Sequence, residues 1–243
     1  MTTVYIVRHG ETDLNRLGRF CGSTNKPLNE RGIAQAETLR APMSKIALDR
    51  IYSSSLDRAV KTAECIRGGR DIEIVTMDSL QEIDCGEWEG LRRDEIEARW
   101  QGGIGIWENT PDLLRMEGGE TFEQVQNRVM RSVIDIVNGN RGKKIAISCH
   151  MLVIQLIMTK ILQAPLRDVW KVVSTATNTS ITTIEIEDNG DFEVVRWSDD
   201  SHLPEELKDA NLKVANMDDA LADTKYGVAN VLGKHHFDDF SIK

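Results

Sequence analysis

The clearest chemical signal is the run Arg-His-Gly-Glu-Thr at residues 8–12. It comes directly after the apolar run 3–7, which is typical of a β-strand. His9 and Arg8 therefore stand where a strand ends and a loop begins, and ligands bind at that edge of open α/β sheets. A histidine there can serve as a nucleophile, an acid, a base or a ligand, and the arginine beside it indicates an anionic substrate. Gly10 would let the backbone turn sharply or approach a ligand closely.

Three further polar residues follow predicted strands in the same way. Arg58 lies in the first turn of a predicted helix, Glu82 follows the next strand, and His150 opens an apolar helix. If these strands and the first one are parallel neighbours, all of the side chains project from one edge of the sheet. A surface role for His9 at a strand end is then the weaker interpretation. The four strands are predicted at 3–8, 50–54, 72–76 and 144–149.

The residue types in this predicted cluster suit phosphoryl transfer. The guanidinium groups of Arg8 and Arg58 can bind phosphate oxygens through paired hydrogen bonds and neutralise their charge. A neutral imidazole such as that of His9 can attack phosphorus. Burial would raise the pKa of Glu82, which could then protonate the leaving alkoxide. Spacing alone does not choose this carboxyl group over its neighbours Asp84, Glu87 and Glu89.

The composition excludes several classes of partner. The chain has 243 residues, 40% of them hydrophobic, and a formal net charge of −9. This charge disfavours nucleic acid and anionic membranes, so a bound anion must be held by a local basic cluster. No apolar run approaches the roughly 20 residues of a membrane span and no signal peptide is recognisable, which predicts a cytoplasmic protein. The cysteines have no metal-binding spacing and are predicted to be free thiols: Cys21, Cys65, Cys85 and Cys149.

Short apolar runs alternate with longer helical patterns, which predicts an α/β fold with a largely parallel sheet. Two more strands are predicted at 180–187 and 191–197. The hairpin signal at 188–191 joins them, so the sheet is expected to be mixed.

Helix signals are clear at three places. Capping-box spacing at 121–124 precedes apolar residues at helical period, and Gly139 ends that run. The same spacing at 54–57 predicts a second helix start. The stretch 151–162 is apolar almost all round, which is typical of a buried helix.

The predicted domain organisation is simple. Residues 1–203 form one domain, and the glycine-rich segment 101–120 is interpreted as a mobile cap inserted between helices. Residues 204–243 form a charged extension that could act as a lid or a dimer arm. One amphipathic helix is expected in it near 204–222.

These motifs together resemble those of the histidine phosphatase superfamily, branch 1, also called the phosphoglycerate mutase-like family. The shared features are the run 8–12 followed by Asn15, the run Ser-Ser-Ser-Leu-Asp-Arg-Ala at 53–59, the acidic motif at 82–90, and the late histidine. The resemblance covers about residues 1–200 and implies a three-layer α/β/α sandwich around a mixed sheet. It also implies an enzyme that needs no metal and no cofactor.

The resemblance assigns roles to individual residues. In the family the first histidine is phosphorylated and then releases phosphate, which makes His9 the expected nucleophile and Glu82 the proton donor and acceptor. Arg8, Arg58 and His150 are expected to form the phosphate pocket. The residues expected to contact substrate are Asn15, Cys21, Gly22, Ser23 and Met151.

The chain departs from the family pattern at two of these positions. Met151 stands where the family usually has glycine, which brings a large side chain into the pocket wall. Cys21 stands where a polar, substrate-contacting residue is expected. Both departures bear on the identity of the substrate more than on the chemistry.

The resemblance favours a phosphatase that hydrolyses a small phosphomonoester. The motif at 84–90 is similar to that of the phosphatase members, and the Arg-x-Tyr-Gly-Gly pattern of the cofactor-dependent mutases is absent. A phosphoglycerate mutase is the first alternative, because Arg92, Arg93 and Arg99 could supply the extra basic residues that a bisphosphate needs. A non-catalytic phosphate-binding or interaction module is the second, although it predicts loss of the nucleophile or the acid.

The expected partner is a small phosphorylated metabolite, and a homodimer is a further prediction. The alcohol part of the ester stays open among sugar phosphates, phosphoglycerate derivatives and a nucleoside phosphate. The segment 101–120 and the extension are expected to select it.

Overall fold

A six-stranded sheet forms the centre of the molecule. The computed structural model describes residues 1–208, and the strands lie in the order β3-β2-β4-β1-β5-β6. All six predicted strands are confirmed, with ends displaced by no more than two residues. Their bounds are β1 Thr2–Arg8, β2 Arg50–Ser54, β3 Ile74–Met77, β4 Lys144–Cys149, β5 Ile181–Ile186 and β6 Phe192–Asp199.

The sheet is mixed, as predicted. Strands β3, β2, β4 and β1 are parallel neighbours, whereas β5 runs antiparallel to both β1 and β6. The predicted hairpin turn joins β5 and β6. There the amide of Glu187 donates to the carbonyl of Asp191 at 2.7 Å, and Gly190 adopts a φ of 90° that favours glycine.

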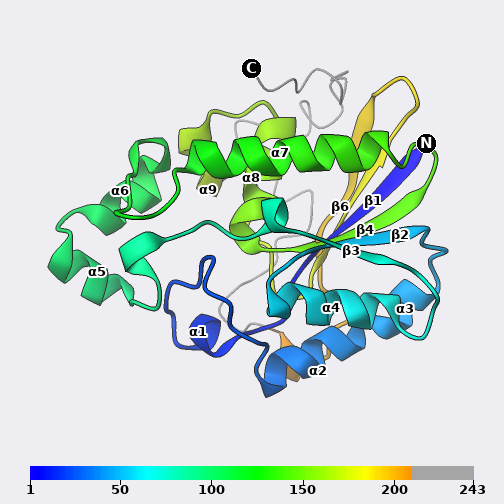
Figure 1. Cartoon of the computed structure of the whole chain (residues 1–243), viewed down its shortest axis with the longest axis horizontal. Coiled ribbons are helices and arrows are strands. Elements are labelled where there is room, and N and C mark those ends of the chain that lie inside the picture. Colours follow the sequence, from blue (N-terminus) through cyan, green and yellow to red (C-terminus); the bar gives the residue numbers. More distant parts are fainter. Residues whose placement is uncertain (209–243) are drawn as a thin grey trace.

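Helices cover both faces of the sheet, which confirms the three-layer arrangement. Figure 1 shows α2, α3 and α4 on one side of the strands and α7, α8 and α9 on the other, with α5 and α6 set apart at one end. The helices are α1 Asp13–Arg16, α2 Glu30–Thr38, α3 Arg40–Ser44, α4 Asp57–Arg67, α5 Arg93–Arg99, α6 Gly103–Asn109, α7 Phe122–Asn138, α8 Met151–Ile161 and α9 Val169–Val172.

Local sequence explains the two long helices of the second layer. The side chain of Thr121 accepts from the amide of Gln124 and that of Gln124 accepts in return, so the predicted capping box opens α7. Helix α8 is buried along almost its whole length between α7 and the sheet, as its apolar sequence predicts. It begins directly after β4, which brings His150 to the point where strand becomes helix.

The predicted capping box at 54–57 is wrong. Helix α4 begins at Asp57, its N-cap is Leu56, and no side chain caps it. The hydroxyl of Ser54 instead accepts from the amide of Leu56 at 3.3 Å and bonds the ring of His150 at 2.7 Å. The ring of His150 thus binds the Ser54 hydroxyl group that the local spacing had assigned to the helix cap.

The segment 101–120 is ordered into α6 and a short 3-10 helix, Pro111–Leu113. It packs inward through Trp107, which is 8% exposed, so the predicted inserted segment lies against the main core. Its predicted mobility is not tested by this structure.

The start of the predicted charged extension packs on α2. The carbonyl of Leu207 accepts from the side chain of Gln35 at 2.9 Å, and that of Lys208 accepts from Arg31 at 2.7 Å. A short 3-10 helix spans Glu205–Leu207, and the remainder of the helix predicted near 204–222 lies outside the described residues. The proposed domain end at 203 stays a prediction.

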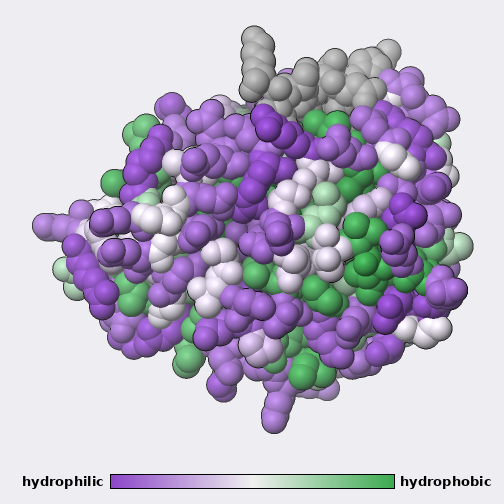
Figure 2. Space-filling model, viewed as in Figure 1, coloured by the Kyte–Doolittle hydropathy of each residue, from purple (hydrophilic) through white to green (hydrophobic). Residues whose placement is uncertain are grey.

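The surface is predominantly polar. Figure 2 shows hydrophilic residues over most of the face in view, with hydrophobic ones gathered mainly to the right of centre. Among residues 1–208, no helix is long and apolar enough to cross a bilayer.

Candidate active site

The carboxyl ends of the parallel strands bring the predicted residues to one edge of the sheet. Arg8 pairs in register with Cys149, so His9 and His150 follow neighbouring strand ends. Their rings lie 5.1 Å apart between centroids. Arg58, in the first turn of α4, follows β2 on the other side of β4. The predicted convergence at this edge is therefore present.

One hydrogen bond defines the state of His9. Its Nδ1 lies 2.6 Å from the carbonyl oxygen of Gly10, which can only accept, so Nδ1 carries the proton. Burial and the positive charges of Arg58 and Arg8 lower the pKa of His9 well below 6.5, which keeps the ring neutral. The remaining nitrogen, Nε2, then presents a lone pair.

His150 is held in the complementary way. Its Nε2 lies 2.7 Å from the hydroxyl of Ser54, which already accepts from Leu56 and can donate its hydrogen to the ring. In that tautomer the proton of the neutral ring is on Nδ1, which is buried without a hydrogen-bond partner among the described residues. Burial and the charge of Arg58 lower the pKa of His150. An anion would satisfy this buried N–H group.

Two buried arginines supply positive charge. The side chain of Arg58 is fully buried, and it donates to the carbonyls of Thr24 at 2.9 Å and Gly22 at 2.6 Å. Its Nε is buried without a partner in the described part of the chain. Arg8 donates to the carbonyl of Ala176 at 2.7 Å, which anchors its guanidinium beside His9. Both charges are thus fixed by backbone before any phosphate arrives.

Glu82 is the carboxyl group that reaches the site. Its two oxygens accept from the amides of Ile83 at 3.0 Å and Leu152 at 3.1 Å. Burial raises its pKa above 4.5, and these two amides oppose that shift only in part. A raised pKa favours the protonated form, which is the form that a general acid requires.

The three carboxylates that sequence spacing could not exclude lie elsewhere: two of them bind backbone amides and one is exposed. Asp84 accepts from the amide of Gly86, and Glu89 accepts from the amides of Gly22 and Cys85. Glu87 is exposed. None of the three lines the cavity described next, so the geometry favours Glu82.

A cavity of about 430 Å³ opens at this edge of the sheet, and its lining includes His9 but not the fully buried Arg58 and His150. Arg8, His9 and Glu82 line its inner end. Of the residues predicted to contact substrate, three also line it: Asn15, Cys21 and Met151. Burial raises the pKa of the Cys21 thiol, so this side chain enters the cavity uncharged.

Gly22 and Ser23 are not among the residues that line this cavity. The carbonyl of Gly22 binds Arg58, and its Cα faces backbone, because a Cβ there would lie 2.1 Å from the carbonyl oxygen of Ile83. The structure gives this glycine a role in holding Arg58 rather than a place in the cavity wall.

Sequence reasoning identified only part of the outer wall of the cavity, namely the segment 101–120, which supplies Trp107 and Glu108. Arg93, one of three arginines considered for a second anion site, lines the cavity and forms an ion pair with Glu108 from α6. Arg92 instead pairs with Asp94 on the exposed side of the helix. The other wall residues that the sequence did not single out are Gly18, Arg19, Phe20, Ile83, Cys85, Trp107, Leu152, Trp170 and Thr175.

Two tryptophans from distant parts of the chain meet in that wall. The indole of Trp170 donates to the carbonyl of Trp107 at 2.6 Å, and the ring centroids are 5.2 Å apart. Phe20 packs edge-on to Trp107 at 5.0 Å. The local sequence around either tryptophan does not predict this contact, because the contact depends on how α6 and α9 pack.

Comparison with known proteins agrees with the fold. The family model for the histidine phosphatase superfamily (branch 1) matches residues 4–200. Bacillus stearothermophilus YhfR has a TM-score of 0.79 and 36% identity, covering 83% of this chain and 99% of that one. Phosphoserine phosphatase of Entamoeba histolytica, in complex with 3-phosphoglyceric acid, has a TM-score of 0.74 and 27% identity, covering 84% and 100%. Phosphoserine phosphatase 1 of Hydrogenobacter thermophilus is 29% identical over 170 residues, 70% of this chain and 81% of that one.

The chain therefore belongs to the histidine phosphatase superfamily, branch 1. Within it, the chain is a phosphatase: it hydrolyses phosphate esters of small molecules.

Proposed function

We propose that this phosphatase hydrolyses a small phosphomonoester through a phosphohistidine at Nε2 of His9. The observation that carries this proposal is the short contact between Nδ1 of His9 and the carbonyl of Gly10, 2.6 Å long. It leaves Nε2 as the unprotonated nitrogen, in a ring whose pKa is lowered by burial and by two arginines. A nucleophile is thus available at neutral pH without a separate base.

The first step transfers the phosphoryl group to the enzyme. Arg8, Arg58 and Nδ1 of His150 hold the non-bridging oxygens, and the Nε2 lone pair of His9 attacks phosphorus. A bond forms from Nε2 to phosphorus as the bond to the ester oxygen breaks. The protonated carboxyl group of Glu82 gives its proton to that oxygen, and the alcohol leaves.

The second step returns the enzyme to its starting state. The carboxylate of Glu82 takes a proton from water, whose oxygen attacks phosphorus. The bond from phosphorus to Nε2 breaks, and its electron pair returns to the imidazole of His9. Inorganic phosphate leaves, with Glu82 protonated again.

The outer wall is proposed to bind the alcohol part of the ester. Trp107 and Trp170 offer apolar surface. Arg19 and Arg93 also line the cavity, each in an ion pair, with Glu95 and Glu108 respectively. A cavity of about 430 Å³ has room for more than the phosphate group. Alcohols with a carboxylate fit this chemistry, and phosphoserine is the substrate named for two of the relatives above.

The mutase alternative is disfavoured by the same wall. It needs several basic residues around the pocket, but of the three arginines considered only Arg93 lines the cavity, and Arg92 pairs with Asp94. Arg99 is exposed and is not among the cavity-lining residues. The binding-module alternative has no support, because nucleophile, acid and anion-binding groups are all present.

The test is phosphate release from a panel of phosphomonoesters in the presence of a chelator. The panel contains phosphoserine, 3-phosphoglycerate, sugar phosphates and a nucleoside phosphate, and each is run beside His9→Ala. Chelator-resistant release that is lost in the variant supports the proposal, as does acid-labile labelling of His9 in a quenched reaction. Conversion of 3- to 2-phosphoglycerate that depends on 2,3-bisphosphoglycerate, without release, would favour the mutase instead.

Location in the cytoplasm and assembly as a homodimer stay predictions of the sequence. Cell fractionation and light scattering of the full chain test them directly.

A further inference from the structure

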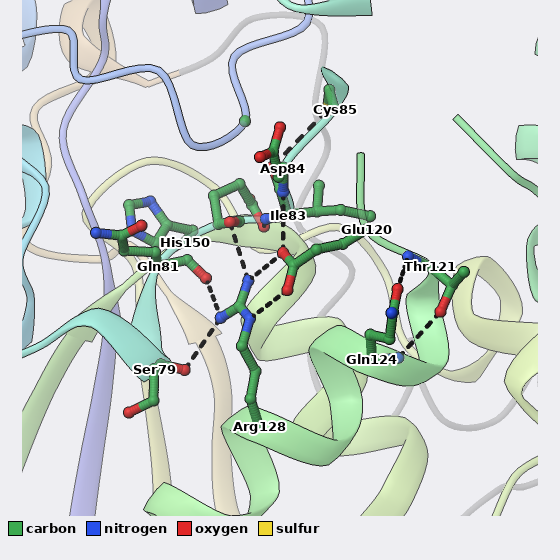
Figure 3. A network of polar contacts seen from close by, with 12 residues as sticks. Ser79, Gln81, Ile83, Asp84, Cys85, Glu120, Thr121, Gln124, Arg128 and His150 are labelled. Carbon is green, nitrogen blue, oxygen red and sulfur yellow. Dashed lines mark hydrogen bonds and ion pairs between the residues drawn. The ribbon is translucent and has the colours of Figure 1, made fainter. Parts of the chain in front are cut away.

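Arg128 on α7 uses every N–H group of its guanidinium. Nη1 donates to the carbonyls of Ser79 at 3.0 Å and Gln81 at 2.7 Å, and Nη2 donates to that of Glu82 at 3.1 Å. The remaining two N–H groups donate to the two carboxylate oxygens of Glu120, both at 2.8 Å. Figure 3 shows this group at the centre of the network, with Ser79 and Gln81 on one side and Glu120 on the other.

Glu120 holds the other side of the same loop. The oxygen that pairs with Nη2 of Arg128 also accepts from the amide of Asp84 at 3.0 Å. The backbone amide of Glu120 donates to the carbonyl of Asp84 at 2.8 Å. Residue 82 is therefore flanked on both sides by peptide groups that the two residues of one ion pair hold in place.

The carboxyl group of Glu82 is held by backbone amides and not by a charged side chain of the described residues. It accepts two amide hydrogens, from Ile83 and Leu152, and forms no ion pair in the described part of the chain. Its position therefore depends on the backbone that carries it, together with the single amide of Leu152 in α8. A shift of that backbone would move the acid away from the ester oxygen without changing its chemistry.

We propose that Arg128 and Glu120 are positioning residues for the general acid, and this inference rests on the proposed role of Glu82. Neither side chain lines the cavity, and each acts through the loop 79–84. An arginine is required at 128 because its planar fork offers five donors, whereas lysine offers three on a flexible stem. Arg128→Lys keeps the charge and loses the fork.

A positioning role predicts a dependence on the leaving group. An alkyl phosphate needs a proton at its departing oxygen, whereas a p-nitrophenyl phosphate expels a stable anion and needs the acid much less. We expect Arg128→Lys and Glu120→Gln to lower kcat/KM for an alkyl phosphate by ~10- to 100-fold. The same variants should lower kcat/KM for p-nitrophenyl phosphate by no more than ~3-fold.

Two controls complete the experiment. Arg131→Lys makes the same change at an exposed position of the same helix, and it should leave both values unaltered. Glu82→Gln calibrates the assay, since removal of the acid itself must show the leaving-group dependence. Thermal unfolding of each variant reports whether the fold is retained.

The outcomes separate the two claims. Selective loss in Glu82→Gln and in both positioning variants supports the inference. Selective loss in Glu82→Gln, with equal loss or no loss for both esters in Arg128→Lys and Glu120→Gln, would overturn the inference and leave the proposed function standing. Equal loss for both esters in Glu82→Gln would overturn the acid assignment itself.

Discussion

The two ends of the cavity are built on different physical terms. At the inner end, His9 lines the cavity and is 4% exposed, while Arg58 and His150 are fully buried and do not line it. Backbone carbonyls or a hydroxyl group orient each of the three side chains. At the outer end, the side chains of Arg93 and Glu108 are 53% and 50% exposed and are paired with each other.

This contrast separates chemistry from selectivity. Groups that are dry and already oriented interact strongly with a developing charge, and they lose little free energy to reorganisation during the reaction. An exposed ion pair is screened by water and contributes at most about 1 kcal/mol, so it can open for a ligand at small cost. The inner end should therefore act alike on every phosphomonoester, while the outer end should discriminate between alcohols.

The largest effect is expected when the nucleophile is removed. His9→Ala should lower kcat by at least ~10³-fold on every ester of the panel, because no other group can carry the phosphoryl intermediate. Steady-state phosphate release measures this, and His202→Ala, outside the cavity lining, serves as the control. Activity of the variant within ~10-fold of the parent would break the comparison at its inner end.

The next effect is expected in the pH profile. Since the pKa of His9 is lowered from 6.5 by burial and the pKa of Glu82 is raised from 4.5 by burial, the active form has a neutral ring and a protonated carboxyl group. The value of kcat/KM for an alkyl ester should rise as His9 loses its proton and fall as Glu82 loses its own.

Glu82→Gln should remove the falling limb of that profile and lower kcat/KM at its maximum by ~10²-fold. Initial rates across a pH series measure both. A parent rate that rises steadily above about pH 8 would contradict the assignment of the acid.

A smaller effect is expected on stability. The pKa values of His9 and His150 are held well below 6.5 by burial and by Arg58, so below pH 6.5 the unfolded chain binds protons that the folded chain does not. This contribution to stability is fully present above pH 6.5 and is lost as the pH falls, by up to about 1.4 kcal/mol per histidine and pH unit. The raised pKa of Glu82 acts with the opposite sign above pH 4.5, where rising pH weakens the folded state until that group has ionised in both states.

Urea unfolding at several pH values measures the slope. His9→Asn should flatten it, because the variant has one titrating histidine fewer at the inner end. An unchanged slope would show that His9 is not the buried neutral ring described above.

The smallest effect is expected at the outer end. Glu108→Gln leaves the charge of Arg93 available, so kcat/KM for esters with a carboxylate in the alcohol part should rise by ~2- to 10-fold relative to neutral esters. The gain should shrink in about 0.5 M salt, because exposed charges are screened. Arg93→Gln is the matched variant and should shift the preference the other way, whereas equal changes for both classes of ester would remove the outer end from substrate selection.

The residues at the inner end could be predicted from the sequence because each follows a recognisable strand end. His9, Arg58 and His150 each follow an apolar run that is a strand, and parallel strands bring their carboxyl ends together. Such placement is readable without knowing any long-range packing. The family motif then chose Glu82 among four nearby carboxylates, which spacing could not do.

The remainder depended on contacts between distant segments. Trp170 meets Trp107 across 63 positions of the chain, and Arg128 reaches the carbonyl of Glu82 across 46. Neither residue has a local pattern that distinguishes it from an ordinary helix residue. The prediction for Ser54 was wrong although its local pattern was clear. Its spacing fits a helix cap, but its hydroxyl group instead bonds the ring of His150.

Gly10 connects the nucleophile His9 to helix α2, which does not line the cavity. A Cβ at Gly10 would lie 2.4 Å from the carbonyl oxygen of Gly32 in α2, and one at Gly32 would lie 2.0 Å from the carbonyl oxygen of Glu11. The carbonyl group of Gly10, which fixes the tautomer of His9, thus belongs to a residue whose backbone packs against that of Gly32 with no room for a side chain. For protein engineering, this means that residues of the outer wall can be varied widely, whereas the backbone contact between Gly10 and Gly32 cannot. Adding a single methyl group at residue 32 should lower the nucleophilicity of His9.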